Sequence, residues 1–421
     1  MKILAEQYKL EITGSEEEFF SPSSQDCKFH INDTPSEFQN KIIHFAAEEF
    51  FKRVLRKRTT FLGMSKDFTD VLVAKNRPMT KTLTLMTEED EERALKVFKV
   101  IVRIGEEAKL DNVFRLIENL IALCQSTSQE LKNEVFLQLI KQSSTDQELA
   151  AIRVYQSLAV FLHIYIPDQD FIFAGLYLFY RRLQDNKNSE KEEEYLRYLF
   201  KKMLRRIENP PMIGYMPIKY QMMALMCKRQ ISIPVYLPVG NSILIKVESY
   251  DTFADIKERV IAEFGINSRR IKPEMFRFFE IVNFENEELE ESPINENQIV
   301  WDIMTYWELA KEKYKEANSP PPAFFLMVKV IYAFEIYPDD IEGIELCFAQ
   351  CYFDYFIGRI RLDLNAMSAL AACVKKIKLS NRPEKEILGS FPIWMVKKHD
   401  KADLATAMIE NIRQMEAESL T

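Results

Sequence analysis

The chain is poor in glycine, with 10 in 421 residues, and it contains only 4 histidines. Scarce glycine leaves few positions for tight turns, so it favours a helix-rich architecture over a many-stranded one. No glycines form the phosphate-binding patterns G-x-x-x-x-G-K or G-x-G-x-x-G, and no G-x-S-x-G turn is present. These absences argue against an enzyme, and we expect no cofactor.

The cysteines and histidines also lack metal-binding spacing. The six cysteines form no C-x-x-C pair, and the histidines are far apart in the chain. Cys347 and Cys351 would share a helix face, but Glu345 and Asp354 are weak additional ligands, so we predict no metal site. Most cysteines sit among apolar neighbours, which is typical of reduced core residues in a cytosolic protein.

Long hydrophobic runs are missing as well. The longest apolar stretch, residues 171–180, has ten residues, which is too short to cross a bilayer and predicts a buried helix. The N-terminus reaches acidic and polar residues by Glu6, so no signal peptide is visible. These features predict a soluble cytoplasmic protein of two to four domains.

Charge is unevenly distributed along the chain. The net charge is −8, but residues 51–230 carry 30 Lys/Arg and 23 Asp/Glu, a net +7. Residues 1–50 have a net charge of −6 and residues 231–421 of −9. A basic middle segment between acidic flanks predicts an acidic partner surface for the middle segment and a different partner for the rest.

Helical signals dominate the first half. Thr87, followed by Asp90, predicts a capped helix start, with Gly105 as its stop. Thr127 with Glu130 predicts a second capping box. Further helices are expected at 151–165, 171–184 and 191–207, whereas the stretch around residues 15–26 is expected to be loop.

The most specific motif is LKNEVFLQLIKQ, residues 131–142, in which Leu131, Val135 and Leu139 recur at helical spacing. Its polar residues resemble the signature helix of the myosin tail homology 4 (MyTH4) domain, a helical bundle that accompanies FERM modules in some myosin and kinesin tails. The resemblance implies a cytoskeletal interaction protein. We expect the signature residues to be structural: Glu134, Gln138, Lys141 and Gln142.

The apolar period changes from 3.6 to 2 at Ile231. Alternating residues on both sides of Gly240-Asn241 predict a β-hairpin, and Thr252 with Asp255 predicts a capped helix closed by Gly265. A strand follows at 276–282. This order resembles the ubiquitin-like first lobe of a FERM domain.

A proline triplet at 320–322 marks the next expected boundary, because consecutive prolines stiffen a linker. The helical patterns that follow resemble the second FERM lobe, and we expect no third lobe. The predicted fold is therefore mainly α. Its segments are an acidic leader (1–39), a MyTH4 helical bundle (40–210), a connector (211–230), a ubiquitin-like β-grasp first FERM lobe (231–318) and a helical second FERM lobe (323–421).

Basic clusters in the bundle suggest its partner. Glu-rich tubulin fits the net positive segment, and the resemblance implies microtubule binding. Nucleic acid is not expected, because no aromatic-interleaved strand or zinc finger accompanies the basic residues. Anionic lipid is a weaker candidate that the FERM resemblance implies. The hypothetical tubulin-binding residues are Lys52, Arg53, Arg56, Lys57, Arg58, Lys201, Lys202, Arg205 and Arg206.

We therefore predict a non-enzymatic, cytoskeleton-associated module. The bundle would bind microtubules, and the FERM part would bind a cargo or the cytoplasmic tail of a membrane protein. One alternative is a static structural component of a cytoskeletal or ciliary assembly. Another is the N-terminal cargo tail of a kinesin-like motor, whose motor domain would follow Thr421.

Overall fold

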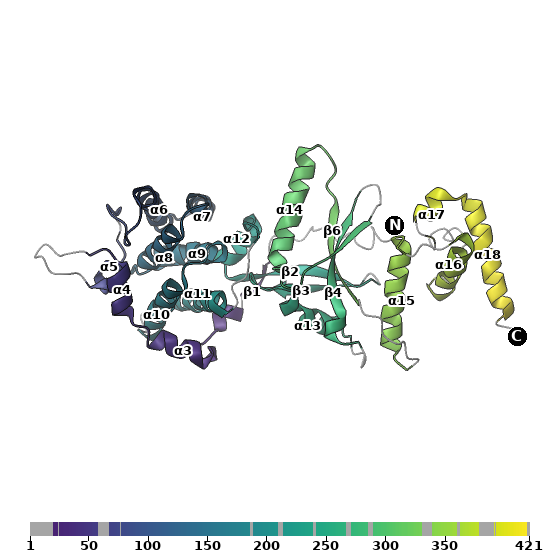
Figure 1. Cartoon of the computed structure of the whole chain (residues 1–421), viewed down its shortest axis with the longest axis horizontal. Coiled ribbons are helices and arrows are strands. Elements are labelled where there is room, and N and C mark those ends of the chain that lie inside the picture. The colour runs from purple at the N-terminus through teal and green to yellow at the C-terminus, as the bar shows by residue number, and fades with distance from the viewer. Residues whose placement is uncertain are drawn as a thin grey trace, which may run out of the picture.

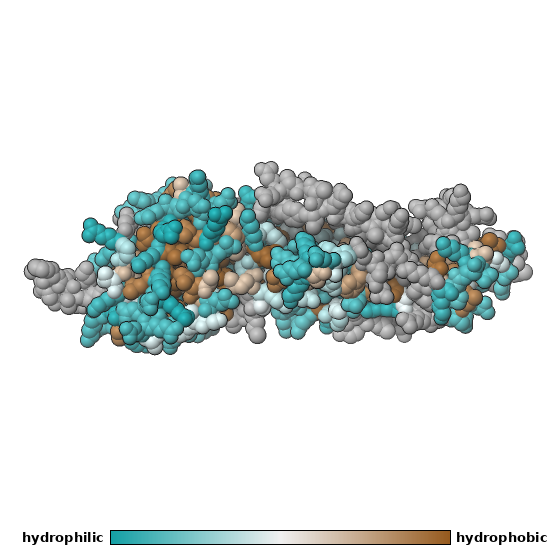
Figure 2. Space-filling model, turned by 90° about the horizontal axis from the view of Figure 1, so that it is seen from above, coloured by the Kyte–Doolittle hydropathy of each residue, from teal (hydrophilic) through white to brown (hydrophobic). Residues whose placement is uncertain are grey.

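A computed structural model shows a helical bundle at one end, a β-sheet in the middle and a group of helices at the other end (Figure 1). Hydrophobic residues gather on the bundle in the view of Figure 2, beside a hydrophilic area in the middle of the molecule. The structure describes residues 20–23, 25–57, 67–75, 77–185, 188–208, 214–238, 241–266, 271–284, 289–330, 339–359, 363–378, 391 and 393–418.

The bundle is built around α8, the predicted signature helix. All but one of the α8 residues from Leu131 onward are buried, because α6, α9 and α10 pack around it. The helices of this part are α3 (Ser36–Ile43), α4 (Ala47–Val54), α5 (Phe68–Val71), α6 (Glu88–Glu106), α7 (Leu110–Cys124), α8 (Gln129–Gln142), α9 (Glu148–Ile164), α10 (Gln169–Gln184) and α11 (Glu190–Glu208).

Two of the predicted helix ends need correction. Thr87 caps α6 as predicted, since its Oγ1 accepts from the Asp90 N–H. The cap of α8 is Ser128, which accepts from the backbone N–H of Leu131, whereas the hydroxyl of Thr127 donates to a carbonyl of the preceding helix. Gly105 lies inside α6 instead of ending it, and a Cβ there would meet the Ala150 side chain at 3.6 Å.

The central sheet has the strand order β1-β2-β6-β4-β5, with β3 also paired to β2. The predicted hairpin is confirmed, because Ile233 lies opposite Ile245 in the antiparallel β2–β3 pair. The strands are β1 (Phe20–Ser23), β2 (Arg229–Tyr236), β3 (Ser242–Val247), β4 (Phe276–Asn283), β5 (Leu289–Pro293) and β6 (Ala323–Val330).

The predicted boundary between the two FERM lobes, at 318–323, is wrong. Residues after the proline triplet form β6, which pairs antiparallel with β4 and parallel with β2. A strand in the middle of the sheet cannot belong to the next lobe, so the triplet turns the chain from α14 (Val300–Glu316) into the same sheet. The β-grasp lobe therefore extends to Val330.

The helix on this sheet follows the sequence signals. Thr252 and Asp255 form a reciprocal capping box at the start of α13 (Phe253–Glu263), as predicted. Gly265 has a φ of +67°, which favours glycine after a helix end. Short 3-10 turns precede the bundle and β4: η1 (Gln25–Lys28), η2 (Ile31–Asp33) and η3 (Pro273–Met275).

The described part of the leader is integrated into the fold, which corrects the loop prediction for this stretch. Strand β1 pairs with the start of β2, so a segment before the bundle joins the sheet after it. The next turn, η1, packs on α11, and Phe29 stacks on Phe200 at 5.8 Å between ring centroids. The leader therefore connects the two parts.

The connector joins them a second time. Helix α12 (Lys219–Met226) packs on α9, and its residues Ala224, Leu225 and Met226 are fully buried. One continuous hydrophobic cluster includes bundle residues such as Ile140 and sheet residues such as Val235. The bundle and the β-grasp lobe thus share a core.

The C-terminal helices form smaller clusters. Helix α15 (Ile341–Phe356) meets the sheet through Leu346, which belongs to the large cluster, and through Phe353, which clusters with Tyr236, Ile281 and Met327. A separate cluster joins Tyr355 to the last three helices. These are α16 (Leu364–Lys378), α17 (Ile393–Lys398) and α18 (Lys401–Glu418). All six cysteines are free; Cys351 and Cys373 are exposed, unlike the core positions expected for most of them.

Candidate functional site

The basic residues around α4 divide into exposed and anchored side chains. Lys52 and Lys57 are exposed. Arg53 is exposed too and pairs with Asp170 at 3.1 Å. Arg56 is largely buried: its Nε donates to the Thr84 carbonyl at 3.0 Å and its guanidinium pairs with Glu91 at 2.7 Å. Arg58 lies outside the described residues.

The second predicted tubulin cluster, on α11, is mainly an internal contact. Lys202 and Arg206 are only 1% and 3% exposed. The Lys202 ammonium donates to Ser249 Oγ at 2.5 Å, and both cations lie against the Tyr250 ring, at 4.5 and 4.7 Å. Arg206 Nε donates to the Leu162 carbonyl at 2.9 Å. Since both charges are enclosed, the prediction that these two residues contact tubulin is wrong.

Burial of a lysine beside tyrosine rings has an electrostatic consequence. Desolvation lowers the pKa of Lys202 from 10.5 to about 8, although Asp26 and Glu248 favour its charged form. The neighbouring His163 ring stacks on Tyr250 at 5.4 Å, and burial lowers the pKa of this imidazole well below 6.5. At the junction between bundle and sheet, desolvation therefore disfavours the charged forms of both Lys202 and His163.

The signature residue Glu134 holds the loop before α6. Its carboxylate accepts from the backbone N–H groups of Leu83 and Thr84, both at 2.8 Å, and from the Thr84 hydroxyl. Gln138 donates to the same carboxylate at 2.9 Å. Burial raises the pKa of Glu134, and these hydrogen bonds oppose that shift.

The other two signature residues hold an earlier part of the same segment. The Lys141 ammonium donates to the carbonyls of Val71, at 2.5 Å, and Val73. The Gln142 amide pairs with both backbone groups of Lys75, at 2.9 and 3.0 Å. Buried polar groups with several backbone partners order a loop that has little regular structure of its own.

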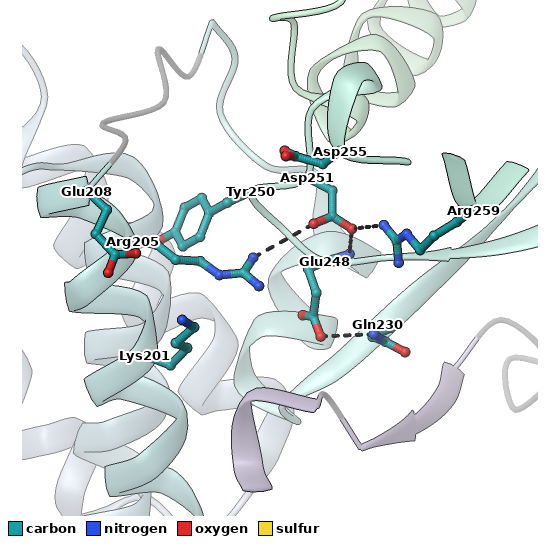
Figure 3. Close-up of a pocket in the computed structure, with 9 residues that line it drawn as sticks. All are labelled: Lys201, Arg205, Glu208, Gln230, Glu248, Tyr250, Asp251, Asp255 and Arg259. Carbon is teal, nitrogen blue, oxygen red and sulfur yellow. Dashed lines mark hydrogen bonds and ion pairs between the residues drawn. The ribbon is translucent and has the colours of Figure 1, made fainter. Parts of the chain in front are cut away.

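A polar cleft lies where α11 faces the β-grasp lobe (Figure 3), with a volume of about 410 Å³. Asp251 is central: its carboxylate pairs with Arg259 at 2.5 Å and Arg205 at 3.8 Å, and accepts from the Glu248 backbone N–H at 2.9 Å. Gln230 donates to the Glu248 carboxylate at 2.9 Å. These contacts organise the cleft wall.

The α11 side of the cleft leaves charges available. Arg205 is committed to Asp26, at 3.6 Å, and to Asp251. Lys201 and Glu208 line the same cleft from α11, and neither forms an ion pair with another described residue. Lys201 lies over the Phe29 ring at 5.0 Å. The lining of the cleft therefore includes a cation and an anion that form no ion pair with another described residue.

The sequence reasoning found Lys201 and Arg205 but missed the acidic half of this site. Glu248 and Asp251 follow β3 in a short turn, and Asp26 comes from the leader. No local pattern marks these residues, because three segments distant in sequence bring them together. The cleft therefore appears only in the tertiary structure.

The described residues contain no group of three or more His, Cys, Asp or Glu side chains arranged to hold a metal ion. Among the helices that the structure describes, none combines the length and apolar character required to cross a membrane. The site is built from ion pairs and hydrogen bonds, which suits recognition of a polar partner.

Comparisons with solved structures place the fold. The first MyTH4-FERM domain (MF1) of Dictyostelium discoideum myosin VII is 14% identical, with a TM-score of 0.71, covering 92% of this chain and 79% of that one. The second (MF2) is also 14% identical, with a TM-score of 0.59 and coverage of 90% and 78%. The chain thus has the fold of a MyTH4-FERM tandem, as the sequence predicted.

Two human myosins extend this likeness. The C-terminal MyTH4-FERM domain of human myosin 7b, solved in complex with the PDZ3 domain of harmonin-a, is 15% identical with a TM-score of 0.55, covering 87% of this chain and 74% of that one. Human unconventional myosin-XVB is 19% identical over 393 residues, which are 89% of this chain but 12% of that protein. No model of a known protein family matches the chain.

Proposed function

We propose that the chain is a non-enzymatic interaction module that binds protein partners at the cytoskeleton, in the cytoplasm. The cleft between α11 and the β-grasp lobe is the observation that supports this function best. Its wall is ordered by ion pairs, while Lys201 and Glu208 line it without an ion pair to another described residue. The myosin 7b structure supports a protein ligand, since that MyTH4-FERM domain was solved with a PDZ domain.

The chemistry of the cleft selects a partner segment that carries both charges. An acidic side chain of the partner would meet Lys201, and a basic one would meet Glu208. Exposed ion pairs contribute only about 0–1 kcal/mol each, so the affinity would depend on several contacts and would fall with salt. This cleft is our candidate site for a cargo or a membrane-protein cytoplasmic tail.

Selection from a library of 16-mer peptides displayed on phage tests this cleft. Peptides enriched on the chain should carry both acidic and basic residues and should bind poorly to the double variant Lys201→Glu/Glu208→Lys. The matched control is Lys311→Glu/Glu308→Lys, which exchanges a half-buried ion pair on α14. Enriched peptides that bind both variants equally well would exclude the cleft as their site.

Microtubule binding by the bundle remains a proposal, restricted to the exposed end near α4. Lys52 and Lys57 are available there, whereas Lys202 and Arg206 are buried. Co-sedimentation with microtubules in rising salt tests it. We expect binding at low salt that Lys52→Glu/Lys57→Glu removes and that Lys313→Glu/Lys315→Glu, a matched change on exposed α14 residues, leaves intact. No binding at low salt, or binding that Lys52→Glu/Lys57→Glu leaves unchanged, contradicts the proposal.

A static role in a cytoskeletal or ciliary assembly differs from an adaptor role in how readily the protein is released from the assembly. An adaptor held by salt-sensitive contacts should leave a cytoskeletal fraction during a salt wash, whereas an assembly component should stay at constant stoichiometry. If retention is constant, the static role is favoured. A kinesin-like motor would be identified by a motor domain in the full-length transcript.

A further inference from the structure

Helix α15 has apolar residues on two opposite faces. The face toward the sheet contains Leu346, Ala349 and Phe353, all buried. A soluble helix with one face on a core normally has charged residues on the other. Here the outer face is apolar as well, which is typical of a helix covered on both sides.

The outer face forms a continuous seam, which we call the α15 seam. Ile341 is 67% exposed and Ile344 is 37% exposed; Phe348 is half-buried and Cys351 is exposed. Their spacing of three, four and three residues places them in one line along the helix, as in the contact positions of paired helices. Phe348 stacks on Tyr352 beside this line, at 6.1 Å between ring centroids.

Just beyond the C-terminal end of the seam, α15 already packs against other helices. Tyr355 projects from the same side of α15 and is 1% exposed, because it clusters with residues of α16–α18 such as Met367 and Leu404. Figure 1 shows α15 between the sheet and these helices. The open part of the seam therefore continues an interface that other helices have begun.

Charge next to the seam defines what could cover its open part. Residues 339–356 contain five carboxylates and no lysine or arginine. Asp339 and Glu345 are exposed and form no ion pair with another described residue. The nearby cations Lys329 and Arg359 are already paired with Glu291. An apolar line with an acidic border complements a helix that has an apolar face and basic edges.

We propose that the α15 seam is a docking surface for a basic amphipathic helix of a partner protein. The partner helix lies along Ile341, Ile344, Phe348 and Cys351, and its Lys or Arg residues approach Asp339 and Glu345. This surface lies on a different part of the chain from the polar cleft and from α4, and it uses apolar contact where they use charge.

Two fluorescent probe peptides test the seam by anisotropy with the full chain. Both are amphipathic helices with leucine on the apolar face; one has lysine at its edges and the other has glutamate there. The lysine peptide should bind saturably, and the glutamate peptide should bind at least about tenfold more weakly. Equal binding of the two peptides, or no saturable binding of the lysine peptide, overturns the proposal.

Variants locate the site. Ile341→Asp/Ile344→Asp should lower the affinity for the lysine peptide at least about tenfold, because it places carboxylates within the apolar contact. Glu345→Lys should lower this affinity roughly two- to fivefold. The matched control is Leu244→Asp, since Leu244 on β3 is 65% exposed and lies outside the seam. Unchanged affinity in the double isoleucine variant, or an equal loss in the Leu244 variant, overturns the proposal.

Two exposed cysteines supply an independent readout that does not require a mutation. Cys351 lies on the seam, and Cys373 lies on α16. The lysine peptide should slow alkylation of Cys351 by N-ethylmaleimide, as measured by mass spectrometry, and leave Cys373 unchanged. Equal alkylation rates with and without the peptide contradict docking at the seam. Concentration-dependent self-association that Ile341→Asp/Ile344→Asp abolishes would assign the seam to a second copy instead.

Discussion

The bundle and the β-grasp lobe are joined in a different way from the lobe and its C-terminal helices. The first junction combines a shared hydrophobic core, the leader strand β1 and buried cations on the Tyr250 ring. The second relies on Leu346, the one described α15 residue in that core, on a small apolar cluster around Phe353 and on ion pairs around Lys329. The comparison teaches that the order of domains along the sequence does not show which of them share a hydrophobic core.

The largest expected effect comes from a variant that disrupts the first junction. Tyr250→Ala should reduce the free energy of unfolding by about 3–5 kcal/mol, because it removes a buried ring against which both Lys202 and Arg206 lie. Urea denaturation measures this change. The control is Tyr306→Ala, whose ring is 42% exposed. If the two variants lose similar stability, the junction is not the shared core described here.

The next effect depends on pH and on Lys202. The folded pKa is lowered to about 8 from 10.5, so between these values the unfolded state binds more protons than the folded state. The free energy of unfolding of the native chain should therefore rise with pH across this window, relative to Lys202→Met, by up to about 3 kcal/mol. Below pH 8 the difference should be constant. Denaturation of both proteins over this range measures it, and parallel curves contradict it.

A smaller and more local effect is expected at the second junction. Lys329 is buried and pairs with Asp354 at 2.6 Å and with Glu291 at 3.2 Å. Lys329→Met should cost about 2 kcal/mol, since the carboxylates lose a buried partner. Hydrogen exchange should accelerate in α15 and not in α8. The control Lys311→Met removes the half-buried ion pair with Glu308 on α14. Faster exchange in both α15 and α8 of the Lys329 variant would show that the two junctions unfold together.

The smallest pair of effects compares two glycines inside the bundle. A Cβ at Gly175 would meet the Phe136 ring at 2.6 Å, so Gly175→Ala should destabilise by about 1–3 kcal/mol. At Gly105 the nearest contact is 3.6 Å, so Gly105→Ala should stabilise by about 0.4–1 kcal/mol through reduced unfolded-state entropy. Thermal unfolding of both variants gives the comparison, and effects of the same sign would contradict the packing around α10.

Local signals were the reliable part of the prediction. The Thr87 and Thr252 caps, the β2–β3 pairing and the left-handed Gly265 follow from interactions within a few residues, and each is found in the structure. The cap of α8 differs by one residue because Ser128 and Thr127 offer the same chemistry, so tertiary contacts select between them.

Charged residues were the unreliable part. Periodicity shows that Lys202 and Arg206 share a helix, but not that Tyr250 comes from another domain to cover them. For the same reason Lys57 remains a candidate for surface binding, whereas its neighbour Arg56 supports the fold. Arg56 donates to the Thr84 carbonyl, beside the isolated β-bridge between Leu55 and Thr84. Whether a cation binds a partner or supports the fold depends on what packs against it.

The sequence by itself determined the helices, the hairpin and the resemblance to a MyTH4-FERM tandem, since capping, apolar periodicity and turn chemistry act over short distances. Only the tertiary structure decided that β6, which follows the prolines, lies in the middle of the sheet, that Phe20–Ser23 joins the sheet, and that half of the α11 cluster is internal. Those outcomes depend on strand pairing and burial between segments far apart in the chain, where no local pattern records the partner.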